Sequence, residues 1–101
     1  INGGWSNLAA RNVITHGSGA AFRVDEGTGK GWRPPWARPN RIEENIVSVD
    51  SDGGVVAYVN APDLGLGFVQ FARNRYSGNL NDKSFRIHPQ IMRWGEFGSL
   101  L

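Results

Sequence analysis

The chain has 101 residues, a formal net charge of +2, a hydrophobic fraction of 40% and no cysteine. A chain of this size holds one modest core, so we expect a single domain over residues 1–101. The strand signals of the sequence predict that this domain is all-β, and it could be a fragment of a larger polypeptide. The missing cysteines exclude disulfides, thiolate zinc sites, iron–sulfur clusters and a cysteine nucleophile. No apolar run approaches the roughly 20 residues that a bilayer requires, so no membrane span is expected.

The first predicted element is a short helix over residues 5–12. Trp5, Leu8 and Ala9 share one helical face there, and Ser6 is a suitable cap. Residues 20–24 alternate apolar and polar side chains, and Asp-Glu-Gly-Thr-Gly follows them, which predicts a strand that ends in a turn.

Residues 29–41 contain three prolines and no strand or helix period, so they predict an extended loop. Indole rings and guanidinium groups alternate along this loop. Together such groups suit stacking on sugars or aromatic rings and paired hydrogen bonds to acidic groups. The candidate contact residues are Trp32, Arg33, Trp36, Arg38 and Arg41. The alternative is that both tryptophans plug one end of a barrel.

The strongest strand signal is a pair of β-branched runs at residues 45–50 and 55–59. Between them lies Ser-Asp-Gly-Gly, and glycine after aspartate is typical of a tight hairpin turn. The pattern therefore predicts a β-hairpin.

Further strands are predicted at residues 66–72, 83–88 and 91–94. The stretch 74–82 is rich in asparagine and glycine and predicts a second loop. We include Tyr76 and Asn79 from this loop as additional ligand contacts.

These elements together predict a small antiparallel sandwich or barrel of about six short strands, with at most one short N-terminal helix. Tryptophan and glycine recur at no fixed spacing, which argues against solenoids and propellers.

Nine of the eleven basic residues are arginine, which favours an interaction surface over simple solvation. We therefore expect a non-catalytic recognition module that binds a glycan or a protein surface and that is able to form homo-oligomers. Short strands, Gly/Asn loops, few lysines, no cysteine and the tail at 85–95 are similar to the head domains of viral or phage fibres. This resemblance implies the tip of a fibre or adhesin, outside the cell or on a virion surface.

The alternative function is a small ribonuclease-type toxin domain that acts on nucleic acid. Two histidines can serve as general base and general acid while cations hold the phosphate. The candidates are His16, His88, Lys30 and Arg86. No cofactor is expected, and no metal site, because the histidine spacing does not match a zinc motif and the Asp50–Gly53 stretch lacks the remaining ligands of a calcium loop.

Overall fold

A computed structural model describes residues 1, 3–16, 19–27, 33–50, 55–62, 64, 67–81, 84–88 and 90–91. Within these ranges the regular structure is entirely β, in ten strands. The all-β class is therefore confirmed. No helix long and apolar enough to cross a membrane occurs in this part of the chain.

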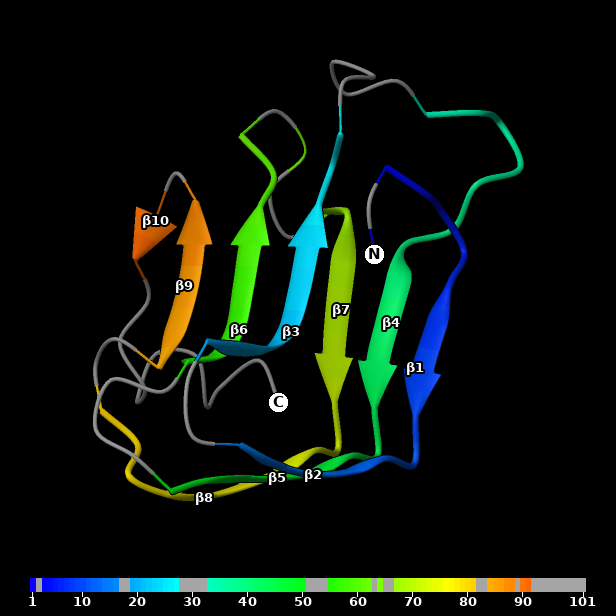
Figure 1. Ribbon diagram of the computed structural model, residues 1–101. Helices are drawn as coiled ribbons and strands as arrows, with labels where there is room; N and C mark the ends of the chain where they lie inside the picture. The colour runs from blue at the N-terminus through cyan, green and yellow to red at the C-terminus, as the bar shows by residue number, and fades with distance from the viewer. Residues whose placement is uncertain are drawn as a thin grey trace.

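The strands form three sheets, which make three walls around a common interior (Figure 1). The first sheet contains β1 (Leu8–Ala10), β4 (Asn40–Glu43) and β7 (Val69–Ala72). The second sheet contains β2 (Val13–His16), β5 (Ile46–Val49) and β8 (Arg75–Gly78). The third sheet contains β3 (Ala20–Asp25), β6 (Val55–Asn60), β9 (Phe85–His88) and β10 (Gln90–Ile91).

Neighbouring strands within each sheet come from successive coils of the chain and run parallel. The first coil comprises β1, β2 and β3, the second comprises β4, β5 and β6, and the third comprises β7, β8 and β9. Among the pairs in the described residues, β10 with β9 is the antiparallel one. The molecule is thus a parallel β-helix of three coils, and the predicted antiparallel sandwich or barrel is wrong, as is the exclusion of a solenoid.

The predicted hairpin is also wrong, although both of its strands exist. β5 lies in the second sheet and β6 in the third, so the two runs turn a corner of the solenoid instead of pairing with each other. Residues 51–54, which carry the turn signal, lie outside the described residues. A turn motif between two β-branched runs fits a hairpin and a β-helix corner equally well, because both need a change of direction.

Two other predicted elements differ from the structure. The predicted helix at 5–12 contains β1, because Ser6 has a φ of 62° and Leu8–Ala10 pairs with β4. The predicted loop at 74–82 contains β8, whose residue Tyr76 lies opposite Val47 and packs against the core. In both places pairing with the neighbouring coil outweighs a weak local preference.

The remaining strand predictions are largely confirmed. The runs at 20–24 and 83–88 correspond to β3 and β9, and the run at 66–72 corresponds to β7, which begins at Val69. Within 91–94, Ile91 lies in β10, and the residues after it lie outside the described part of the chain.

Inward side chains form apolar rows that cross the coils. Ala9, Ile42 and Phe71 form the row of the first sheet. Ile14, Val47 and Tyr76 form the row of the second sheet. The second-coil members of both rows are fully buried, whereas Ala9 and Ile14 in the first coil are only half-buried. The core is therefore best covered at the second coil.

The corner between the first two sheets repeats in every coil. A residue with a left-handed backbone comes first, with φ values of 57° at Arg11, 60° at Glu44 and 55° at Arg73. An asparagine follows in each coil, and we call Asn12, Asn45 and Asn74 the asparagine ladder. Asparagine suits such a corner because its side-chain amide satisfies main-chain groups that a sharp turn leaves unpaired.

The ladder joins the coils through one bonding pattern. The main chain and Nδ2 of Asn12 both donate to Oδ1 of Asn45, at 3.0 and 2.9 Å. The main chain and Nδ2 of Asn45 donate in the same way to Oδ1 of Asn74, again at 3.0 and 2.9 Å. The spacing is 33 residues in the first step and 29 in the second. This unequal repeat is what a search for a fixed period misses.

Candidate ligand-binding site

A hollow of about 420 Å³ lies where the chain enters β4, and we call it the β4 hollow. Its lining residues come from three separate parts of the chain: Ser6, Arg38, Pro39, Arg41 and Gln70. Two of the arginines predicted as ligand contacts, Arg38 and Arg41, are thus brought together in one concave site.

The solenoid register explains why these residues meet. Arg41 in β4 lies opposite Gln70 in β7, and both side chains are exposed. The main chain of Arg38 bonds with Ser6 ahead of β1: Ser6 N donates to the Arg38 carbonyl at 2.9 Å, and Arg38 N donates to the Ser6 hydroxyl at 3.0 Å. Residues up to 64 positions apart in sequence therefore lie at one surface.

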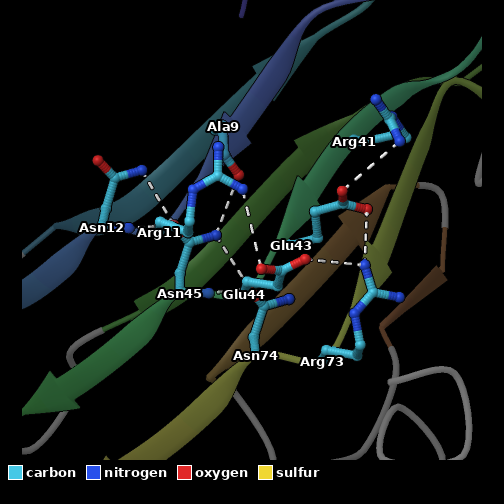
Figure 2. A network of polar contacts seen from close by, with 9 residues as sticks. All are labelled: Ala9, Arg11, Asn12, Arg41, Glu43, Glu44, Asn45, Arg73 and Asn74. Carbon is cyan, nitrogen blue, oxygen red and sulfur yellow. Dashed lines mark hydrogen bonds and ion pairs between the residues drawn. The ribbon is translucent and has the colours of Figure 1, made fainter.

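The two arginines differ in their electrostatic surroundings. Arg41 Nη1 lies 3.5 Å from Glu43 Oε1, and Glu43 Oε2 also lies 3.4 Å from Arg73 Nη2 (Figure 2). Arg38 is exposed, and its guanidinium has no hydrogen bond or ion pair among the described residues. A guanidinium without a carboxylate partner is free to bind an acidic or hydroxyl-rich ligand in a paired geometry.

The exposed indole of the loop lies two residues before Arg38. Trp36 is 72% exposed, so it does not plug the end of the fold, and that alternative is wrong for this ring. The turn that presents it is closed by the Ala37 amide, which donates to the Pro34 carbonyl at 3.0 Å. Trp32 lies outside the described residues.

Arg33 has a structural contact instead. Its guanidinium carbon lies 5.3 Å above the Trp5 ring, and its Nη2 donates to the Ala37 carbonyl at 3.0 Å. Trp5 in turn meets Phe68 edge-on, with ring centroids 5.1 Å apart. Arg33 therefore attaches the loop to the apolar core, and its guanidinium is already engaged within the chain.

The two additional candidates, Tyr76 in β8 and Asn79 directly after it, are not among the lining residues of the β4 hollow. The Tyr76 ring meets Phe85 edge-on at 5.0 Å, and burial raises the pKa of its hydroxyl well above the ordinary value. Asn79 is exposed, and its main-chain amide donates to the Val49 carbonyl at 2.8 Å.

The residues of the ribonuclease alternative are spread over the fold. His16 ends β2 in the second sheet and first coil, whereas His88 ends β9 in the third sheet and third coil. Arg86 lies two positions before His88 on the exposed face of β9, and Lys30 lies outside the described residues. This backbone placement offers no observation in favour of an acid–base pair, so the alternative stays a prediction without support.

Sequence reasoning missed Ser6 and Gln70. Neither belongs to a motif, and each reaches the hollow only through the pairing of β1, β4 and β7. The recurrence of Ala-Arg-Asn at residues 10–12 and 72–74, with Glu-Glu-Asn at 43–45, is the signal from which that pairing could be deduced.

Comparisons of the chain with protein families, with curated proteins and with solved structures found no match. No group of three or more potential metal ligands occurs among the residues that the structure describes. The functional argument therefore stands on the geometry of the β4 hollow.

Proposed function

We propose that this chain is a non-catalytic recognition module that binds glycans at the β4 hollow. The observation that carries the proposal is that two arginines, Arg38 and Arg41, line one hollow, while the exposed Trp36 lies two residues before Arg38 in the chain. An indole face packs on the apolar face of a sugar ring, while guanidinium and amide groups bind its hydroxyl or acidic substituents.

The lining of the hollow favours acidic sugars. Both charged residues that line it in the described part of the chain are cationic, and Ser6 and Gln70 add neutral hydrogen-bonding groups. A carboxylate or sulfate on the ligand would form charge-assisted hydrogen bonds with Arg38, which are about twice as strong as neutral ones. Arg41 would also contact the ligand while its guanidinium keeps the ion pair with Glu43.

The test is a glycan array followed by calorimetry with the sugars that bind. Arg38→Gln removes the charge and is expected to weaken binding about tenfold or more, since hydrogen bonds to charged groups contribute about 1.5–3 kcal/mol. Arg75→Gln is the matched control, because Arg75 is exposed on β8 in another sheet and does not line the hollow.

Trp36→Ala tests the aromatic part of the site. Because the ring is largely exposed, its removal is expected to weaken glycan binding while the melting temperature stays nearly unchanged. A large fall in melting temperature with unchanged binding would contradict the role given to this ring. If the parent chain binds no glycan, or if Arg38→Gln and Arg75→Gln bind equally well, the proposed function is wrong.

A further inference from the structure

The outer edge of the first coil is formed by β1, β2 and β3, and these strands differ in whether another segment covers them. Among the described residues, β1 pairs only with β4 and β2 pairs only with β5, so each is an edge strand of its sheet. The C-terminal end of the β3 edge is covered, because Ile1 and Gly3 run beside Arg23 and Asp25. Gly3 N donates to the Asp25 carbonyl at 2.8 Å, and Asp25 N donates to the Ile1 carbonyl at 2.9 Å. Within the part of the chain that the structure describes, the first two sheets are thus open at this end, and the third is partly covered.

The open edge carries a row of main-chain groups. Along a strand, the main-chain groups of alternate residues point to opposite neighbours. The Asn12 carbonyl accepts from Ile46 N on the second-coil side, so the amides of Val13 and Thr15 point to the open side. An unpaired edge of this kind is a template for another strand.

The open edge also carries two side-chain acceptors at defined positions. In the second coil, Oδ1 of Asn40 and of Asn45 each accepts two bonds from the first coil, from the main chain and the side chain of Asn7 and of Asn12. Oδ1 of Asn7 and Oδ1 of Asn12 receive no such bonds within the described residues. The first coil therefore repeats the acceptor pattern of the second coil without the donors that complete it.

Exposed apolar side chains at this end also favour the binding of another segment. Val13 is 78% exposed, and the core residues Ala9 and Ile14 are half-buried where their second-coil counterparts are fully buried. An added layer of polypeptide would cover these side chains and contribute roughly 25 cal/mol for each Å² of apolar surface removed from water.

We propose that the edge of β1 and β2 binds an extended polypeptide segment that contributes two parallel strands and an asparagine at the corner between them. The corner asparagine would donate its main-chain and side-chain amides to Oδ1 of Asn12, as Asn12 donates to Asn45. The occupant is a two-strand segment because Ile1 and Gly3 already lie beside β3. A second whole copy would bring a complete coil, whose third strand would fall on those residues.

The probe is a synthetic peptide with the sequence of residues 5–16, which is the segment that pairs with the second coil in this way. The full chain, labelled with ¹⁵N, is titrated with this peptide. We expect saturable binding with chemical-shift changes confined to β1, β2 and the corner at Asn12. A peptide in which both asparagines are replaced by alanine is expected to bind at least fivefold more weakly, and a scrambled peptide is expected not to bind.

A protein variant tests the edge itself. Thr15→Pro removes an amide that points to the open side and breaks no bond to the second coil, so the variant should keep its fold and lose peptide binding. Retained glycan binding or an unchanged far-UV spectrum verifies the fold. No saturable binding by the parent protein, or equal binding of the two-alanine peptide, would overturn the proposal. Dimerisation of the chain in sedimentation that competes with the peptide would overturn the two-strand occupant in favour of a second copy.

Discussion

Single asparagines connect the coils of this fold to one another. Asn45 is completely buried, and its Nδ2 donates to the Ala9 carbonyl at 3.1 Å and to Oδ1 of Asn74 at 2.9 Å. Its Oδ1 accepts two bonds from Asn12. One side chain thus joins all three coils, and its removal leaves several buried polar groups without partners.

Asn45→Ala is therefore expected to lower the free energy of unfolding by about 2–4 kcal/mol, because each buried polar group left unpaired costs about 1–3 kcal/mol. Urea denaturation of the variant measures this loss. Asn79→Ala is the control, since Asn79 is exposed and its bond to the Val49 carbonyl is made by the main-chain amide, which alanine retains. Equal stabilities of the two variants would show that the ladder does not hold the coils together.

Asp25 gives the fold a dependence on pH. Its side chain accepts from Asn60 Nδ2 at 2.8 Å and from Arg23 Nε at 3.1 Å. The bond from Asn60 first, and the bond and charge of Arg23 after it, hold the pKa of Asp25 below its ordinary value of 3.8. The folded chain therefore keeps this carboxylate ionised at a pH where the unfolded chain protonates it.

A lowered folded pKa stabilises the fold above the unfolded pKa, and this contribution is lost as pH falls through the folded value. Asn60→Ala should then be less stable than the parent at pH 7, and the difference should narrow as pH falls from about 4 to 2. Urea denaturation across this range measures the difference, and carbon NMR of the Asp25 carboxyl follows its pKa. A difference that is constant between pH 7 and pH 2 would show that Asn60 acts without Asp25.

The stacked strands leave no room for a side chain at Gly78, where β8 ends. Gly78 ends β8 opposite Val49, and its φ is 94°. A Cβ at this position would fall on the main-chain carbonyl oxygen of Val49. Only glycine fits, because a positive φ of this size and the close main chain both exclude a side chain.

Gly78→Ala is expected to reduce the free energy of unfolding by about 1–3 kcal/mol, as expected for a side chain forced into a disfavoured backbone region. Gly67→Ala provides the comparison, because a Cβ there meets nothing within 4 Å. That variant should stay within about 0.5 kcal/mol of the parent. Thermal or urea unfolding separates the two, and an unaffected Gly78→Ala protein would mean that β8 does not follow β5 in this register.

At the level of elements, sequence patterns located strands better than they paired them. The β-branched runs at 46–49 and 55–60 are strands because their side chains fit a pleated surface. Pairing depends on residues about 30 positions away, and no local pattern reports it. β1, β2, β4 and β8 were missed because they depend on neighbouring coils for their hydrogen bonds and show a weaker strand pattern than β5, β7 and β9, which are also short.

Only part of the candidate site could be predicted from the sequence. The composition of the loop at 29–41 left open whether its tryptophans are exposed or buried, and the structure has Trp36 and Arg38 exposed. It could not show that Arg33 stacks on Trp5, or that Gln70 completes the hollow, because both facts depend on the order of the coils. The pairs Arg11-Asn12, Glu44-Asn45 and Arg73-Asn74 repeat one corner, and recognising this repeat would have predicted the order of the coils.

Across the whole molecule, charge also follows the stacking of the coils. At the left-handed corner positions Arg11, Glu44 and Arg73 alternate in sign, with contacts of 3.8 Å and 3.2 Å between neighbours (Figure 2). These pairs are exposed, so each contributes little to stability. Their arrangement avoids like charges in adjacent coils, which supports a register in which the three corners lie directly above one another.

Nuclear Overhauser contacts in solution test the central claim, that three parallel coils bring Arg38, Arg41 and Gln70 to one surface. The account predicts contacts between the strand of Val47 and those of Ile14 and Tyr76, which lie on either side of it in the second sheet. Antiparallel contacts between residues 46–49 and 55–60, as in a hairpin, would contradict the solenoid and with it the β4 hollow.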